Sequence, residues 1–400
     1  MMYRPLLRLP GVPLQGVLGF LAQLTQLVAP VGTVLVVQAA TGSLALAGLA
    51  AAAFSLGAGL ARPLQGRLMD HHGSRPILDA TAAVHVCALL GLVAGASLGF
   101  PGWTLVALAA LAGAGLPPIS VSMRVEWGRR IPAAGRTAAY SLVYLVQEMA
   151  LLTGPLLFTV VIALVATASL ALAAVAVAAG LSTVLFARAL HSGGPPPAQA
   201  GGGLFTRPGA PLLLGVAVLA GGCLGVLEVG APALAAARGT PALTGLLIAG
   251  LSLGGITGAI LYGMRPWHAG PGIRLIALLV PLGLCLAPLA WLTASALDRS
   301  APVLPLIGFG VAMFLAGLTF NPSLTTVSLL VDELAPGARS EAFGWLSTAI
   351  GLGTAAGSGL AGLIGDRFGP ATTFAAASAA ALLAALLATV LHLTHTRHRP

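Results

Sequence analysis

Two glutamates stand inside long apolar stretches of this chain, and their type and position could support chemistry. Glu148 shares one helical face with three other polar residues, because Tyr140, Tyr144, Gln147 and Glu148 follow at i, i+4, i+7 and i+8. Glu228 is the second embedded carboxylate, and we expect no arginine at a comparable depth. An ionised carboxylate deep in a membrane costs roughly 3 kcal/mol and usually faces a cavity or a partner. Hydrogen bonding between helices would account for the presence of the tyrosines and the glutamine in this span, but it accounts poorly for that of Glu148. We therefore predict Glu148 and Glu228 as proton-binding sites.

The composition requires a membrane around these residues. Of the 400 residues, 58% are hydrophobic and only 7% are charged, whereas an ordinary soluble domain carries roughly 25% charged residues. A helix needs roughly 20 mostly apolar residues to cross a bilayer, and the chain supplies twelve such runs between residues 12 and 392. Since helices satisfy their own backbone hydrogen bonds in lipid, we predict an all-α membrane protein with twelve transmembrane helices. The fourth of these is predicted to cover residues 102–123.

The orientation of the chain follows from its basic residues, all 19 of which are arginines. If the N-terminus lies in the cytoplasm, 16 arginines fall on the cytoplasmic side, and only Arg238, Arg299 and Arg367 fall outside. This asymmetry obeys the positive-inside rule and predicts a multi-pass protein of the cell inner (cytoplasmic) membrane with both termini in the cytoplasm. The arginines are not interleaved with aromatic residues on a basic face, which argues against nucleic acid as a partner.

A stretch rich in glycine and proline divides the chain into two halves. We predict that residues 191–209 are a cytoplasmic linker between an N-terminal six-helix bundle (1–190) and a C-terminal six-helix bundle with a short basic tail (210–400). The halves carry traces of a duplication, because Ser55-Leu56-Gly57 recurs as Ser252-Leu253-Gly254 at an offset of 197. Two bundles of this kind would be related by an axis along the membrane normal.

The segment between the second and third apolar runs carries a specific motif. It reads GRLMDHHGSRPIL over residues 66–78 and contains Gly66, Asp70, Gly73 and Arg75. This pattern resembles the loop signature of the major facilitator superfamily of secondary transporters. The resemblance implies that Asp70 holds the two bundles together on the cytoplasmic side, against the start of the eleventh helix and near Arg339. A solvated charged turn is the alternative for so short a motif.

Other signatures of that family are weaker here. Trp267 stands where the second half would repeat the aspartate, so we expect the contact between the bundles to be asymmetric. Ala109 occupies the position of an arginine found in many proton-coupled members, whereas Thr153-Gly154-Pro155 resembles part of the antiporter signature and favours export. The resemblance also places several polar residues on helices that line a central cavity, and we expect substrate contacts from Gln23, Gln26, Tyr140, Tyr144, Gln147 and Asn321.

These features predict a secondary transporter that moves a small organic solute by alternating access, with protons as the coupling ion and export as the direction. An importer or uniporter of a sugar or other metabolite is the alternative within this class, and a non-transporting membrane receptor or scaffold is the alternative outside it. The chain has no phosphate-binding loop, nucleophile elbow or complete set of metal ligands, so we expect no enzyme activity, no cofactor and no bound metal. We expect a monomer in the lipid bilayer.

Overall fold

The computed structural model is almost entirely helical. It describes residues 3–165, 167–191, 204–240, 243–297 and 304–397, and these residues form α-helices and two short 3-10 helices but no strand. Within these ranges twelve helical spans are long and apolar enough to cross a membrane. The prediction of an all-α protein with twelve membrane spans is therefore confirmed.

The helices fall into two groups in chain order. The first group is α1 (Tyr3–Leu7), α2 (Val12–Thr41), α3 (Leu44–His72), α4 (Ser74–Ser97), α5 (Gly102–Ala114), α6 (Ile119–Arg130), α7 (Arg136–Val165) and α8 (Ala168–Ala189). The second group is α9 (Ala210–Ala237), α10 (Leu243–Met264), α11 (Pro271–Leu297), α12 (Leu304–Leu334), α13 (Arg339–Phe368) and α14 (Pro370–Arg397). The 3-10 helices η1 (Ala133–Gly135) and η2 (Leu204–Thr206) precede α7 and α9. Most of the predicted linker, residues 192–203, lies outside the described residues.

The fourth span is longer than predicted, and it is interrupted. Pro117 and Pro118 lack backbone N–H groups, so the helix ends at Ala114 and begins again with α6. The predicted end at residue 123 was wrong, because α6 continues to Arg130 and the whole span covers Gly102–Arg130. A hydropathy argument ends a span at its first charged residues, whereas neighbouring helices here bury Arg124 and Glu126 to 3% and 4% exposure.

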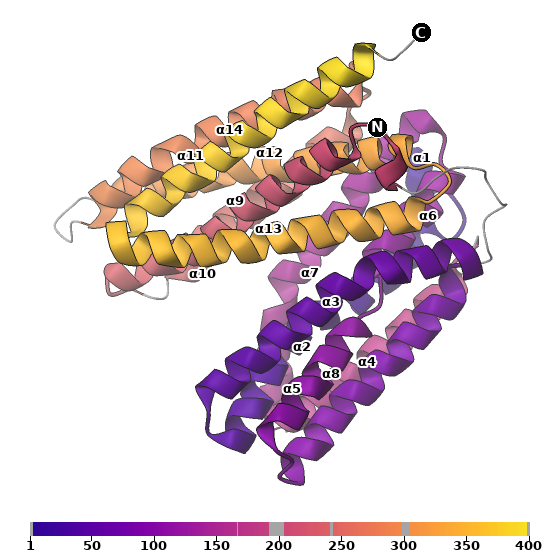
Figure 1. The fold of residues 1–400 in the computed structure, drawn as a ribbon, viewed down its shortest axis with the longest axis vertical. Coiled ribbons are helices and arrows are strands. Elements are labelled where there is room, and N and C mark those ends of the chain that lie inside the picture. The colour runs from indigo at the N-terminus through magenta and orange to yellow at the C-terminus, as the bar shows by residue number, and fades with distance from the viewer. Residues whose placement is uncertain (1–2, 166, 192–203, 241–242, 298–303, 398–400) are drawn as a thin grey trace.

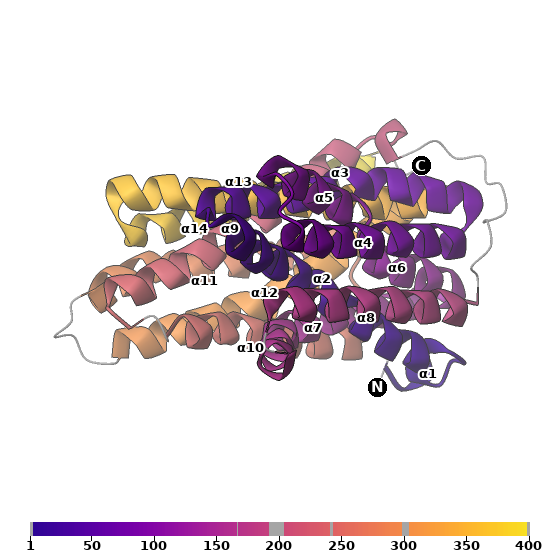
Figure 2. The same cartoon turned by 90° about the horizontal axis from the view of Figure 1, so that it is seen from below.

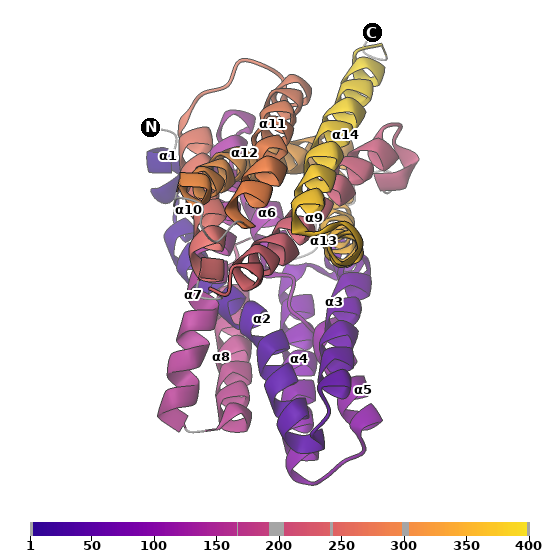
Figure 3. The ribbon, with the colours of Figure 1, turned by 90° about the vertical axis from the view of Figure 1, so that its left-hand side faces the viewer.

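The two halves meet at one end of the molecule and diverge toward the other. Figure 1 shows them as two arms that lie close together near α1 and α6, and Figure 3 shows the same two layers from the side. Seen from below, α3, α4 and α8 of the first half run side by side (Figure 2). Contacts between the halves are made by α3 against α13 and by α7 against α10 and α12. We call the end that contains Asp70, Arg136 and Asp332 the closed end, and the opposite end the far end.

Glycines set the closest helix contacts within each half. Gly57 on α3 faces the carbonyl oxygen of Ala110, and Gly254 on α10 faces that of Phe314, with no room for a Cβ at either place. These two glycines belong to the segments that are related by the offset of 197. The repeated segment therefore has the same packing role in both halves, where it lets two helix backbones touch.

Candidate functional site

The polar face of α7 lies against α12 of the other half. Tyr144 Oη and Ser328 Oγ are 3.1 Å apart, and the Glu148 carboxylate accepts a hydrogen bond of 3.1 Å from Asn321 Nδ2. Tyr140 is fully buried nearer the closed end, where its ring packs edge-on against that of Phe343 on α13. The spacing argument thus placed these residues on one face correctly, and the structure adds that this face joins the two halves.

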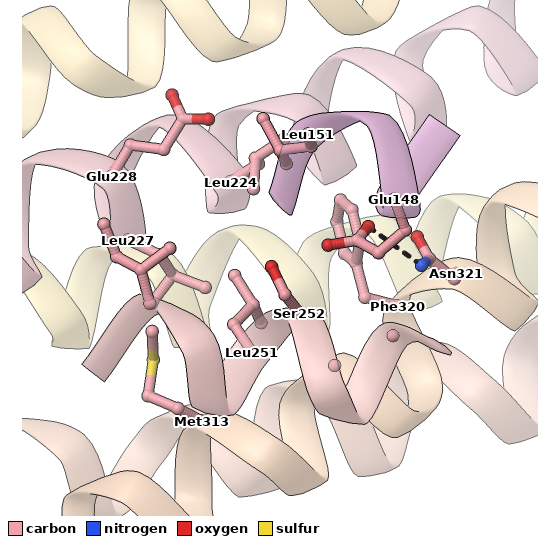
Figure 4. Close-up of a pocket in the computed structure, with 13 residues that line it drawn as sticks. Glu148, Leu151, Leu224, Leu227, Glu228, Leu251, Ser252, Met313, Phe320 and Asn321 are labelled. Carbon is pink, nitrogen blue, oxygen red and sulfur yellow. Dashed lines mark hydrogen bonds between the residues drawn. The ribbon is translucent and has the colours of Figure 1, made fainter. Parts of the chain in front are cut away.

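Both embedded glutamates line one small cavity between the halves. The cavity has a volume of about 60 Å³ and is lined mainly by leucines, Met313 and Phe320. Glu148 comes from α7 of the first half and Glu228 from α9 of the second half, and Ser252 and Asn321 are the other polar residues of the lining (Figure 4). Glu228 lies at the opposite side of the cavity from Glu148 (Figure 4), and its side chain is exposed.

Gly255 on α10 makes room for the hydrogen bond between Glu148 and Asn321. A Cβ at this position would lie 2.6 Å from Asn321 Nδ2 and 3.4 Å from Glu148 Cδ. Only a residue without a side chain leaves both groups where they are, so the backbone of α10 forms one wall of the site.

Arg124 is a charged residue of this region that the sequence argument missed. Its guanidinium donates a hydrogen bond of 3.0 Å to Gln147 Oε1 and lies over the ring of Tyr144, with 4.6 Å between the guanidinium carbon and the ring centroid. The ring of Phe343, from the other half, lies 5.8 Å away on the same measure. The expectation that no arginine accompanies the embedded carboxylates was therefore wrong, because α6 carries Arg124 beside the polar face of α7.

The predicted cavity residues Gln23 and Gln26 do not line the cavity of Glu148. Gln23 donates a hydrogen bond of 3.1 Å to the Gly19 carbonyl oxygen within α2 and contacts Met123 Sδ. Gln26 donates one of 2.8 Å to the carbonyl oxygen of Pro117, at the interruption of the fourth span. Both glutamines thus hold α2 against the fourth span inside the first half.

Three more side chains satisfy carbonyl groups that the interruption leaves without helical partners. Gln65 donates to the carbonyl oxygens of Ala114 and Leu116, at 2.8 and 3.2 Å. Arg62 Nη1 donates to the Leu116 oxygen at 3.3 Å, and His85 Nδ1 lies 2.7 Å from that of Ala112. Since an unpaired carbonyl group in lipid costs several kcal/mol by general estimate, these residues make the interruption tolerable.

Asp70 makes the contact that the family motif implied. Its two carboxylate oxygens accept hydrogen bonds from the backbone N–H groups of Ser340 and Glu341, at 3.1 and 2.9 Å, in the first turn of α13. Gly66, one turn earlier on α3, packs directly against the carbonyl oxygen of Ser340. A carboxylate at a helix N-terminus is favourable because it meets unpaired N–H groups and the positive end of the helix dipole.

Arg339 does not pair with Asp70 but with Asp332, which the sequence argument did not select. Asp332 Oδ1 lies 2.6 Å from Arg339 Nε, and Asp332 Oδ2 lies 2.9 Å from Arg136 Nη1. Its side chain is 1% exposed, so one buried carboxylate holds two arginines from different halves together. The only signal in the sequence was a charged residue directly after an apolar run, and Arg124 stands in the same kind of position.

The remaining motif residues, Gly73 and Arg75, act within the first half. Gly73 has a φ of 88° and forms the turn from α3 to α4. Arg75 donates hydrogen bonds to the carbonyl oxygens of Ala187, Arg188 and Leu190, at 2.6 to 3.2 Å. These carbonyl groups lie at the C-terminal end of α8, so Arg75 caps that helix and does not reach across to the other half.

The second contact between the halves, at α7 and α10, is built differently. Trp267 replaces the aspartate and donates a hydrogen bond of 3.0 Å to the carbonyl oxygen of Tyr262 on its own half. Arg274 on α11 reaches Thr137 Oγ1 of α7 at 3.3 Å, and Tyr3 Oη of α1 donates to the Ala259 carbonyl oxygen at 2.7 Å. The two contacts between the halves are thus asymmetric, as predicted, because the Tyr3 hydroxyl and Arg274 take the place of a second carboxylate.

Comparison with known proteins identifies the fold and the family. The sequence model of the Major Facilitator Superfamily matches residues 16–339, so the chain belongs to this superfamily of transporters. Its structure is similar to that of a bacterial homologue of the iron transporter ferroportin in an outward-facing state, with a TM-score of 0.76, 15% identity and coverage of 94% of this chain and 98% of that one. It is also similar to the human organic anion transporter MFSD10 (TM-score 0.69, 18% identity, 93% and 98% coverage) and to the proton:xylose symporter XylE (TM-score 0.71, 16% identity, 94% coverage of each). No curated protein matches the sequence itself.

Proposed function

We propose that this protein exports a small organic solute across the cytoplasmic membrane by alternating access, in exchange for protons, and that the cavity of Glu148 and Glu228 is its binding centre. The observation that carries the proposal is that two carboxylates from opposite halves line one apolar cavity where the halves meet. A carboxylate in such a place is costly unless it serves a function. Proton coupling also has a precedent in the fold, since XylE is a proton:xylose symporter.

The arginines support a definite orientation for this state. Arg67, Arg75, Arg136 and Arg339 all lie at the closed end, together with α1 and the C-terminal end of α14 (Figure 1). Under the positive-inside rule the closed end faces the cytoplasm and the far end faces outside. The described state is then outward-facing, as is the state of the ferroportin homologue with its similar structure.

The hydrogen bond between Asn321 and Glu148 supplies a means of coupling. Asn321 belongs to the second half and Glu148 to the first, so rocking of the halves breaks this bond and changes the surroundings of the carboxylate. A change of surroundings changes the affinity of Glu148 for a proton. A solute that carries a cationic or hydrogen-bonding group competes with that proton, and this differential binding links the proton gradient to movement.

Flux in proteoliposomes tests the proposal. Purified protein is reconstituted with a pH-sensitive dye inside and is challenged with a panel of compounds under an imposed pH gradient. Glu148→Gln keeps the shape and the hydrogen-bonding capacity of the side chain but cannot ionise. It should abolish gradient-driven accumulation and leave exchange or downhill flux largely intact, and Glu228→Gln tests whether α9 shares the role.

Three results would change the conclusion. If Glu148→Gln accumulates solute as well as the wild-type protein, Glu148 only joins two helices and proton coupling must be sought at Glu228. If solute and protons enter together, the protein is an importer, and flux that ignores the pH gradient indicates a uniporter. If no compound moves while the protein is folded, it is a receptor or scaffold on a transporter fold.

A further inference from the structure

Arg124, like Arg274 at the other contact between the halves, is a buried arginine without a carboxylate partner among the described residues, but of the two only Arg124 is bound to the residues of α7 that neighbour Glu148. It is 3% exposed, and the buried carboxylates of Glu126 and Asp332 pair with Arg130, Arg136 and Arg339 instead. The Nε atom of Arg124 is buried without a hydrogen-bond acceptor, and its one hydrogen bond goes to an uncharged amide oxygen. Aromatic faces and an amide stabilise a guanidinium, but they do not neutralise its charge in a medium of low polarity.

The position of Arg124 connects it with the cavity. It is held by Tyr144 and Gln147 of α7, and Glu148 lies one helical turn beyond Tyr144 on the same face. One helical turn corresponds to about 5.4 Å along the axis. The guanidinium of Arg124 and the carboxyl group of Glu148 thus attach to the same face of α7 about one turn apart, and Glu148 lines the apolar cavity, whereas Arg124 lies beside it and not in its lining.

We propose that Arg124 binds a carboxylate group of the transported solute, and that the solute is an amphoteric molecule with an apolar body. Its cationic group competes with the proton at Glu148, and its carboxylate supplies the counter-charge that the chain itself does not give to Arg124. The planar guanidinium presents paired donors that match a carboxylate. This inference rests on the proposed function, because it names the substrate class of the same site.

The structure also links this binding to the state of the transporter. Phe343, which covers Arg124, lies on α13 only three residues after Ser340, the backbone donor to Asp70. Opening of the closed end moves the start of α13 away and uncovers the guanidinium, while Tyr144 and Gln147 remain with Arg124 in the first half. The solute therefore gains access to Arg124 from the closed end only after the contact of Asp70 is broken.

Binding of three matched compounds to the purified protein tests the proposal. The probes are 4-(aminomethyl)benzoate, which carries both charges, 4-(aminomethyl)benzamide, which is only cationic, and 4-methylbenzoate, which is only anionic. A charge-assisted bidentate contact should make the first probe bind on the order of tenfold more tightly than the amide. Asp70→Asn should tighten the binding of the first probe, since more of the protein then exposes Arg124.

Three variants identify the residue responsible. Arg124→Gln should reduce the ratio of the affinities for 4-(aminomethyl)benzoate and for the amide to about one. Arg124→Lys should retain part of this preference. Gln147→Glu places a carboxylate on Arg124 from within the chain, so it should also abolish the preference while the protein remains at least as stable as the wild type. Arg274→Gln is the matched control, because Arg274 is a similarly buried arginine stacked on aromatic rings, but at the other contact between the halves.

The outcomes separate this inference from the proposed function. Equal binding of the first probe and the amide by the wild type, or a preference that survives both Arg124→Gln and Gln147→Glu, would overturn the role of Arg124. Proton-coupled flux of the purely cationic probe alone would then leave the proposed function standing. A preference that depends on Arg124 without any proton-coupled flux would support the binding site and refute the proposed coupling.

Discussion

Replacement of Asp70 by asparagine should shift the balance between the two states of the transporter. The carboxylate accepts two backbone N–H groups of α13, from Ser340 and Glu341. Asparagine can accept one of these hydrogen bonds, but its amide N–H₂ group then faces the other donor. The variant thus loses one charge-assisted hydrogen bond and the favourable interaction of a negative charge with the helix N-terminus.

The size of the effect follows from these two losses. A charge at a helix N-terminus contributes about 0.3 to 1 kcal/mol at an exposed site and up to about 2 kcal/mol when partly buried. A hydrogen bond to a charged group contributes about 1.5 to 3 kcal/mol, and Asp70 is only half-buried, which reduces both values. A net loss of about 2 kcal/mol changes the ratio of the two states about 30-fold toward the state in which the closed end is open.

Distances between spin labels measure this shift. In a background without Cys87, Cys223 and Cys285, one pair of labels replaces the exposed residues His71 and His268 at the closed end. A second pair replaces Leu98 and Phe368 at the far end, again one in each half. Asp70→Asn should add a longer distance at the closed end and a shorter one at the far end.

The same chemical change elsewhere provides the control. Asp79 is an exposed carboxylate on α4 that makes no contact between the halves, so Asp79→Asn should leave both distance distributions unchanged. If Asp70→Asn also leaves them unchanged in folded protein, the contact at α13 does not hold the closed end shut, and the reasoning above fails.

Three further predictions follow from individual contacts. Gly255→Ala places a methyl group 2.6 Å from Asn321 Nδ2 and should abolish proton-coupled accumulation in proteoliposomes. Gly245→Ala on the same helix, with no atom within 4 Å, should transport normally, and an equal loss of accumulation in both variants would contradict the role of Gly255. Arg75→Gln removes the cap of α8 and should lower the free energy of unfolding by about 1 to 2 kcal/mol in thermal denaturation, without a change in the spin-label distances. Asp332→Asn leaves two arginines without their shared buried counter-charge and should lower the stability of the folded protein by about 3 to 5 kcal/mol. The loss would be seen as disappearance of the monodisperse peak in size-exclusion chromatography, and a variant as stable as the wild type would show that these ion pairs are unimportant.

The sequence by itself determined the membrane class and the number of spans, and it predicts the sidedness of the charges. These properties depend on local composition, because about 20 consecutive apolar residues suffice to define a span. The face shared by Tyr140, Tyr144, Gln147 and Glu148 was also a local matter, set by the 3.6-residue period of one helix. Asp70 was recognised from a short motif, and its contact with the start of α13 matched the expectation from the family.

Only the tertiary structure decided which helix each polar group faces. Asn321 meets Glu148 from 173 positions away, and Asp70 meets Ser340 from 270 positions away, so no periodicity could pair them. Arg124 and Asp332 were missed for a related reason, since hydropathy assigns charged residues at the end of an apolar run to the aqueous loops. Neighbouring helices bury both of them, and burial by residues distant in the sequence is a property that only the packed fold can confer.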